Sequence, residues 1–217
     1  MIYKAVLFDL DGTLLDTLTD IAMTVDRVLE GRHLPTHQLA DYRSFISDGI
    51  AMLITRSLPE DCRDENTVKE CVKEFHSAYE QNWNRMTRPY DGIIETLEKL
   101  AAENVKLAVL SNKSHDFTIK CVREFFPNIP FDLVLGQQTG IPPKPDPTGA
   151  RQISKSMGLL PNQILFVGDS AVDMKTAVAA KMFPVGVLWG FKTYKELKYS
   201  GAEILIKHPS EIVPLVI

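Results

Sequence analysis

Five short apolar runs, most of them separated by stretches with helical periodicity, constrain the fold of this chain more than any other feature. The runs are Ala5–Phe8, Leu107–Leu110, Leu133–Leu135, Ile164–Val167 and Val185–Trp189, and Glu203–Ile206 is a candidate edge strand. Short, continuously apolar runs are typical of strands that are buried on both faces of a parallel sheet. Their alternation with helices predicts an α/β fold built on a doubly wound, Rossmann-like parallel sheet.

The stretches between these runs carry helix start and stop signals. The predicted helices are Ile93–Ala102 after Gly92, Phe117–Phe126 after a Ser114 N-cap, Thr148–Met157 before Gly158, and Ala171–Ala180. Glycine after a helix and serine before one are the residues that these positions favour. The helices therefore support the alternating pattern.

Residues 17–88 interrupt this alternation because they contain no convincing strand. A capping-box pattern at Thr17-x-x-Asp20 begins one predicted helix, and Ala51–Leu58 and Val68–Trp83 give two more. About 70 residues are too many for a simple crossover between strands. We predict that 17–88 form a helical cap inserted into an α/β core made of 1–16 and 89–217.

The overall composition excludes several classes of protein. The chain has 217 residues, 45% of them hydrophobic, and a net charge of −4, which disfavours a nucleic-acid or anionic-membrane surface. Its three cysteines show no metal-binding spacing, no signal-peptide pattern opens the chain, and its apolar runs are too short to cross a bilayer. We expect a soluble, cytoplasmic protein, either a monomer or a weak homodimer, with no nucleic-acid or membrane partner.

Polar residues follow three of the predicted strands, and one lysine follows a fourth. These residues are Asp9 and Asp11, Ser111 and Asn112, Asp169 and Asp173, and Lys144 in the loop Pro142–Pro147. The carboxyl ends of the strands of an open parallel sheet form its ligand crevice. We therefore expect all of these side chains to meet at one edge of the sheet.

The charges of this group predict its chemistry. Four neighbouring carboxylates would repel one another unless a cation lay between them, and an all-oxygen ligand set favours Mg²⁺. Such a metal would also attract a phosphate, to which Lys144 adds a positive charge and Ser111 a hydrogen bond. We expect the phosphate to be bound by Ser111 and Lys144 together with Gly12, Thr13 and Asn112.

Two of the carboxylates suit successive steps of phosphoryl transfer. Asp9, which lies nearer the strand, is placed to attack phosphorus and form an aspartyl-phosphate. Asp11, in the following turn, is placed to protonate the leaving oxygen and then to activate water. The predicted catalytic residues are therefore Asp9, Asp11, Ser111 and Lys144.

These residues resemble the four motifs of the haloacid dehalogenase superfamily. Asp9-Leu10-Asp11-Gly12-Thr13 resembles motif I, Ser111 motif II, Lys144 motif III, and Gly168–Asp173 motif IV. The resemblance implies Asp9 as nucleophile and Asp11 as general acid/base. It also implies Mg²⁺ held by the Asp9 side chain, the Asp11 backbone carbonyl and Asp169, with Asp173 supporting the metal waters, and a C1-type helical cap.

Within the superfamily, the chain most resembles the phosphoglycolate phosphatase-like group. Phe45–Gly49 resembles the cap substrate loop of that group, although Ser47 stands where glycine is usual. The resemblance implies a small phosphorylated metabolite as substrate, with 2-phosphoglycolate as the leading candidate. We expect the cap to close over the site and select this substrate.

Three other functions remain open at this point. A β-phosphoglucomutase-like phosphomutase and an inorganic pyrophosphatase would use the same motifs. A phospho-receiver signalling module also combines an acidic cluster with a lysine, but it would accumulate a phosphoprotein without turnover. The Asp9-x-Asp11 spacing and the inserted helices favour an enzyme over a receiver.

Overall fold

The computed structural model describes residues 3–216 and shows two compact units. One unit comprises Met1–Leu15 with Pro89–Ile217, and the other comprises Asp16–Arg88. The first boundary falls one residue earlier than the one we predicted. Residues 1, 2 and 217, which the predicted core ranges include, lie outside the described residues.

The first unit contains a six-stranded sheet in which all hydrogen-bonded neighbours are parallel. In spatial order the strands are β5 (Leu133–Gln137), β4 (Lys106–Ser114), β1 (Ala5–Phe8), β6 (Ile164–Gly168), β7 (Phe183–Val187) and β8 (Ile204–Ile206). The order runs outward from β1 in both directions, which confirms the doubly wound, Rossmann-like sheet. In such a sheet the ligand crevice lies where the strand order reverses, at the carboxyl end of β1.

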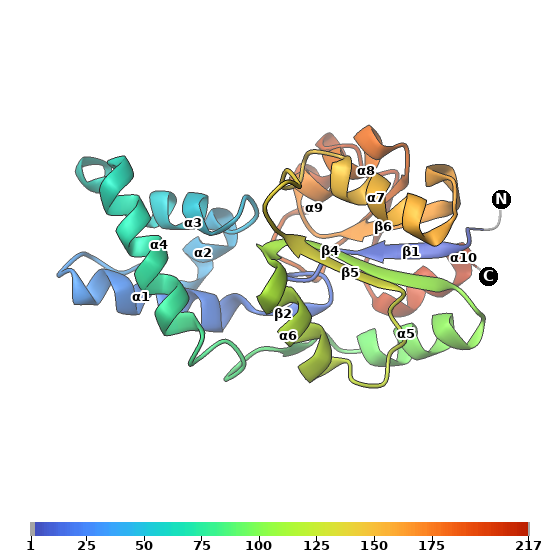
Figure 1. Ribbon diagram of the computed structural model, residues 1–217, viewed down its shortest axis with the longest axis horizontal. Helices are drawn as coiled ribbons and strands as arrows, with labels where there is room; N and C mark the ends of the chain where they lie inside the picture. Colours follow the sequence, from blue (N-terminus) through green and yellow to red (C-terminus); the bar gives the residue numbers. More distant parts are fainter. Residues whose placement is uncertain (1–2, 217) are drawn as a thin grey trace. The chain divides into compact units, whose positions relative to one another are not determined.

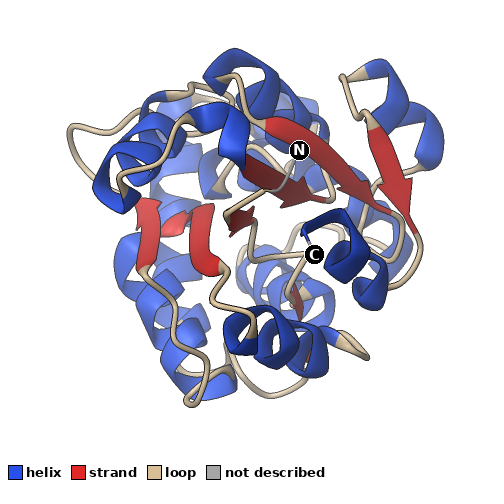
Figure 2. Ribbon diagram, turned by 90° about the vertical axis from the view of Figure 1, so that its right-hand side faces the viewer, coloured by secondary structure: helices blue, strands red, loops and turns tan. Residues whose placement is uncertain are grey.

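Helices cover both faces of this sheet (Figures 1 and 2). Figure 1 shows α7 (Thr148–Met157), α8 (Ala171–Ala180) and α9 (Tyr194–Tyr199) on one face, and α5 (Ile93–Ala102), α6 (His115–Phe125) and α10 (Val213–Val216) on the other. Two short 3-10 helices, Pro161–Gln163 and Pro209–Ile212, precede β6 and α10. Because both faces are covered, the central strands can be apolar along their whole length.

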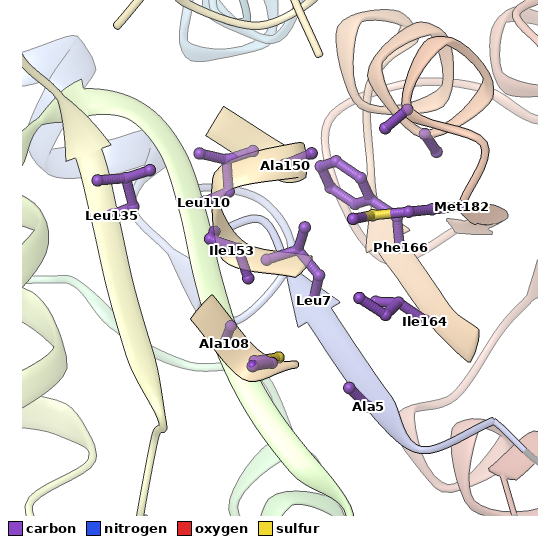
Figure 3. Packing of buried hydrophobic residues seen from close by; sticks show 13 residues of the cluster. Ala5, Leu7, Ala108, Leu110, Leu135, Ala150, Ile153, Ile164, Phe166 and Met182 are labelled. Carbon is purple, nitrogen blue, oxygen red and sulfur yellow. The ribbon is translucent and has the colours of Figure 1, made fainter. Parts of the chain in front are cut away.

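Alternate residues of the central strands form one buried layer (Figure 3). Leu7 of β1 lies beside Ala108 of β4 and Phe166 of β6 in the strand register. These side chains pack with Ala150 and Ile153 of α7 in a single buried cluster. Successive strand residues point to opposite faces of the sheet. The burial of this layer therefore fixes the strand register and the face toward which the side chains at each strand end point.

Some predicted element bounds were wrong by a few residues. β4 continues to Ser114 instead of ending at Leu110, because Ser114 still pairs with Gln137 of β5 after a register shift. α6 therefore begins at His115, two residues before the predicted start. β7 lies two residues earlier than predicted, and the short helix α9 was not predicted at all.

The second unit is built from helices that pack on one another. They are α1 (Leu18–Gly31), α2 (Leu39–Phe45), α3 (Ile50–Ser57) and α4 (Glu65–Tyr79), with a 3-10 helix at Glu60–Cys62. Phe75 and Tyr79 of α4 are buried and stacked, with ring centroids 5.1 Å apart. α4 ends at Tyr79 instead of Trp83, because the side chain of Asn82 donates to the carbonyl of Ala78 (2.8 Å) and closes the last turn.

The carboxylate of Asp20 joins the two ends of this helical unit. Asp20 lies in the first turn of α1 and is buried. Its Oδ2 accepts hydrogen bonds from the N–H of Met86 (2.9 Å), and from the N–H and hydroxyl of Thr87 (2.8 Å each). Beyond these residues, β2 (Leu15–Asp16) and β3 (Arg88–Pro89) pair as a two-stranded sheet.

Within residues 3–216, no helix is both long enough and apolar enough to cross a bilayer.

Candidate active site

Asp9 stands at the carboxyl end of the central strand of the sheet. Its N–H donates to the carbonyl of Val167 (3.0 Å), which continues the ladder between β1 and β6 by one residue. The residue is 7% exposed, so its carboxylate is held among protein atoms with little contact with water. Burial, together with the negative charge of Asp173, raises the pKa of Asp9 to about 7.

Lys144 balances part of this negative charge. Its Nζ lies 2.7 Å from Oδ1 of Asp9 and 2.6 Å from Oδ1 of Asp173. Burial alone would lower the pKa of this ammonium, but the attraction of Asp173 and Asp9 outweighs burial, and the pKa of Lys144 is raised. Lys144 therefore stays charged. Its ion pairs connect the loop after β5 to Asp9, which follows β1, and to Asp173 in the first turn of α8.

Asp173 is held in place by the start of its own helix. Ser170 is the N-cap of α8, and both its N–H (3.0 Å) and its hydroxyl (2.5 Å) donate to Oδ2 of Asp173. Oδ1 of the same carboxylate is the partner of Lys144. Asp173 therefore acts as the third residue of a capping box and as the anchor of Lys144 at once.

Asp169 is held by the loop that follows β7. Its Oδ2 accepts a hydrogen bond from the N–H of Phe191 (2.7 Å), and its pKa is raised well above the usual value by burial and by the charges of Asp173 and Asp9. In the same loop the indole of Trp189 donates to the carbonyl of Thr13 (2.9 Å).

Gly190, between these two residues, packs so closely on Asp169 that a Cβ there would overlap its side chain. Sequence reasoning missed this loop. The only signal for it was that Gly190 and Phe191 directly follow the apolar run Val185–Trp189.

The turn after Asp9 uses its own backbone groups to close on itself. Gly12 has φ +87°, a conformation that favours glycine. Its N–H donates to the carbonyl of Leu15 (2.8 Å), and the N–H of Thr13 donates to the carbonyl of Leu10 (3.3 Å). The turn therefore uses both N–H groups in its own hydrogen bonds, and phosphate binding by Gly12 and Thr13 stays a prediction. The buried hydroxyl of Thr13 has no hydrogen-bond partner among the described residues.

Three consecutive residues near the end of β4 each contact a different part of the site. The hydroxyl of Ser111 accepts from the N–H of Lys113 (3.1 Å), which leaves its own proton to donate to a ligand. The side chain of Asn112 donates to the carbonyl of Lys144 (3.0 Å) and accepts from its N–H (2.7 Å). Nζ of Lys113 contacts both carboxylate oxygens of Asp11, at 3.1 and 3.3 Å.

Sequence reasoning did not identify Lys113 as a site residue. It follows Ser111 by two positions, and residues two apart in a strand lie on the same face. That spacing was the available signal, but the last residues of β4 were not predicted to be strand.

Carboxylate oxygens of Asp9, Asp169 and Asp173 lie within 4.8 Å of one another, and all three residues are buried. Three carboxylates against the single ammonium of Lys144 leave an excess of negative charge, which agrees with the raised pKa values of Asp9 and Asp169. A hard divalent cation with oxygen ligands fits this donor set. We predicted that the carboxylate of Asp11 would be the fourth of this group, but it contacts Nζ of Lys113 and lies outside the cluster of three. The backbone carbonyl of Asp11, which the resemblance implies as a metal ligand, stays a prediction.

Comparison with known proteins shows which family this chain resembles. The model of the family described as haloacid dehalogenase-like hydrolase matches residues 6–187. A phosphoglycolate phosphatase from Pseudomonas syringae pv. tomato is 31% identical over 97% of this chain and 79% of its own length. A phosphoglycolate phosphatase from Aquifex aeolicus is also 31% identical, over 98% of this chain and 96% of its own length.

Solved structures show the same similarity. A crystal structure described as a predicted phosphoglycolate phosphatase from Haemophilus somnus matches with a TM-score of 0.91 and 29% identity, covering 99% of this chain and 98% of that one. A protein from Lactobacillus delbrueckii subsp. bulgaricus matches with a TM-score of 0.94 and 28% identity, covering 100% and 99%. The resemblance inferred from the four motifs is therefore confirmed, and the chain belongs to the haloacid dehalogenase-like hydrolase family.

Proposed function

We propose that this protein is a Mg²⁺-dependent phosphatase that hydrolyses a small phosphorylated metabolite through an aspartyl-phosphate on Asp9. The observation that carries the proposal is the setting of the Asp9 carboxylate. It ends the central strand, lies 2.7 Å from the ammonium of Lys144, and belongs to a buried all-oxygen cluster with Asp169 and Asp173. The family's general use of Mg²⁺ supports the choice of metal.

In the first step, a carboxylate oxygen of Asp9 attacks phosphorus and the bond to the leaving oxygen breaks. The electron pair of that bond goes to the leaving oxygen, which takes a proton from Asp11 and departs as an alcohol. Ser111 and Lys144 orient the phosphoryl group and offset its charge. Asp9 and Asp169 would hold Mg²⁺, which would neutralise further negative charge on the phosphoryl group.

In the second step, water attacks the phosphorus of the aspartyl-phosphate. Asp11, now a carboxylate, accepts a proton from this water, and the acyl phosphate bond breaks to return Asp9 and inorganic phosphate. The same carboxyl group therefore gives up a proton in the first step and recovers one in the second. Each turnover consumes one water molecule and leaves the protein unchanged.

The proposed substrate is 2-phosphoglycolate. Several relatives of about 30% identity that align over nearly the whole chain are named phosphoglycolate phosphatases. The substrate is small and dianionic at its phosphate, which suits a site whose cations are Lys144 and a bound metal.

The test is phosphate release from a panel containing 2-phosphoglycolate, sugar phosphates, nucleotides and pyrophosphate, with Mg²⁺ or with EDTA. We expect phosphate release that requires Mg²⁺ and is lost in Asp9→Asn. Among the compounds of the panel, 2-phosphoglycolate should have the highest kcat/KM. Absence of phosphate release from every compound would contradict a phosphatase. Conversion of a sugar phosphate into its isomer without release would identify a phosphomutase instead.

A further inference from the structure

Lys113 is a partly buried lysine that the proposed chemical steps do not use. Its Nζ contacts both oxygens of the Asp11 carboxylate, at 3.1 and 3.3 Å, and its side chain is 8% exposed. The carboxylate of Asp11 is 15% exposed. The pair is therefore shielded from water, and its geometry is not that of a loose surface ion pair.

The backbone of Lys113 is also fixed. Its N–H donates to the hydroxyl of Ser111 (3.1 Å). On the other side, the hydroxyl of Thr118 in α6 donates to the carbonyl of Ser114 (2.9 Å), and its oxygen also lies 3.3 Å from the carbonyl oxygen of Lys113. Because the backbone is held on both sides of Lys113, the position of its Cα is fixed. Lys113 can therefore restrain the group at its other end.

Asp11 needs such a restraint. It lies in the tight turn that Gly12 makes possible, and its carboxylate must reach the leaving oxygen of the substrate. Lys144 contacts the carboxylates of Asp9 and Asp173, so it is not placed to orient Asp11. Contact of one ammonium with both oxygens of Asp11 limits the rotation of its carboxylate.

We infer that Lys113 is a positioning residue, which fixes the Asp11 carboxyl group for proton transfer to the leaving oxygen. This inference rests on the proposed function. β4 then supplies three successive contributions to the site: Ser111 contacts the phosphate, Asn112 holds Lys144, and Lys113 holds Asp11. A residue that acts only through Asp11 affects the steps in which Asp11 moves a proton, and it leaves phosphate binding nearly unchanged.

The test uses two substrates whose leaving groups differ in their need for a proton. A phosphorylated alcohol such as 2-phosphoglycolate leaves as a strongly basic alkoxide unless it is protonated, whereas p-nitrophenyl phosphate leaves as a weakly basic phenolate. kcat/KM reports the first irreversible step, the transfer of the phosphoryl group to Asp9, so it isolates the protonation of the leaving group. Hydrolysis of the aspartyl-phosphate is common to both substrates and does not affect this comparison.

We expect Lys113→Met to lower kcat/KM for the phosphorylated alcohol by about 10–100-fold, because a positioned proton donor contributes about 10²–10⁴-fold and the variant loses only part of this. For p-nitrophenyl phosphate, kcat/KM should fall by less than about threefold. Asp11→Asn should show the same selectivity with a larger loss. Lys113→Arg keeps a cationic donor and should recover much of the activity. Lys175→Met, which removes an exposed lysine of α8, should change neither value.

Two further measurements separate positioning from a structural role. The thermal midpoint of each variant and its Mg²⁺ affinity by calorimetry should stay close to those of the wild type. Equal losses of kcat/KM on both substrates, or no loss on either, while Asp11→Asn remains selective, would overturn the inference and leave the proposed function intact. A wild-type protein that releases no phosphate would overturn the proposed function itself.

Discussion

The side chain of Asn112 is bound to the backbone of Lys144 by two hydrogen bonds. Its Nδ2 donates to the Lys144 carbonyl (3.0 Å), and its Oδ1 accepts from the Lys144 N–H (2.7 Å). The two residues are 32 positions apart, in β4 and in the loop after β5. This pair of bonds holds the backbone of Lys144 in the position from which its ammonium reaches Asp9.

We predict that Asn112→Ala weakens both the fold and the site. Loss of the amide leaves the polar backbone groups of Lys144 without partners, at a cost of about 1–3 kcal/mol. The loosened loop should also raise KM, because Lys144 would no longer be held toward the phosphate. Urea denaturation and steady-state kinetics measure the two effects. Asn66→Ala, at an exposed position, is the control, and an unchanged KM for Asn112→Ala would contradict the prediction.

Lys144→Met should be strongly destabilising. The change leaves buried carboxylates of Asp9, Asp169 and Asp173 without their ammonium, and breaking a buried ion pair in this way costs about 3–5 kcal/mol. Addition of Mg²⁺ should recover part of the loss, because the metal restores positive charge to the cluster. Urea denaturation with and without Mg²⁺ measures this. Lys99→Met on α5 is exposed and should be neutral, and equal stability of the two variants would refute the prediction.

Asp20→Ala should destabilise the helical unit. Its carboxylate is the acceptor for the N–H of Met86 and for both donors of Thr87, all 66 or 67 residues away in sequence. Removal leaves these donors without that acceptor, at about 1–3 kcal/mol for each that stays buried and unpaired. Hydrogen exchange at Met86 and Thr87 should become faster in the variant, and a wild-type exchange rate there would show that Asp20 does not hold this segment.

The thiol of Cys121 gives a pH-dependent prediction. Burial raises its pKa to about 11, whereas a thiol in the unfolded chain has a pKa of about 8.5. Between these values the folded state binds more protons than the unfolded state, so this thiol makes the free energy of unfolding fall as pH rises. Cys121→Ala should therefore show a smaller fall between about pH 8.5 and about pH 11 than the wild type. Identical slopes would indicate that the thiol ionises normally in the folded state.

The sequence was sufficient to predict the elements whose residues are buried on a regular period. β1, α5, α7 and α8 have the predicted bounds, because apolar spacing and terminal glycine or serine define them locally. α2 was missed because only Tyr42 of its seven residues is buried, so it carries no apolar stripe. β4 was predicted too short because its apolar run ends at Leu110, whereas the strand continues through polar residues such as Lys113.

The site was predictable in its residue types and less so in its contacts. The position of Asp9 and Asp169 at strand ends follows from the rule that ligand sites lie at the carboxyl edge of a parallel sheet. The partner of Asp11 and the loop around Trp189 and Phe191 depend on contacts between segments distant in sequence. Such contacts leave no periodic or compositional pattern, so only the folded arrangement reveals them.

The most direct test of the account is to trap the phosphorylated carboxylate. Turnover of 2-phosphoglycolate with Mg²⁺ is quenched in acid, the acyl phosphate is reduced with borohydride to homoserine, and the modified peptide is identified by mass spectrometry. We predict homoserine at position 9, dependent on substrate and Mg²⁺, and none in Asp9→Asn. Steady turnover with no modification at Asp9, or with modification at another residue, would contradict the assignment of Asp9 as the nucleophile.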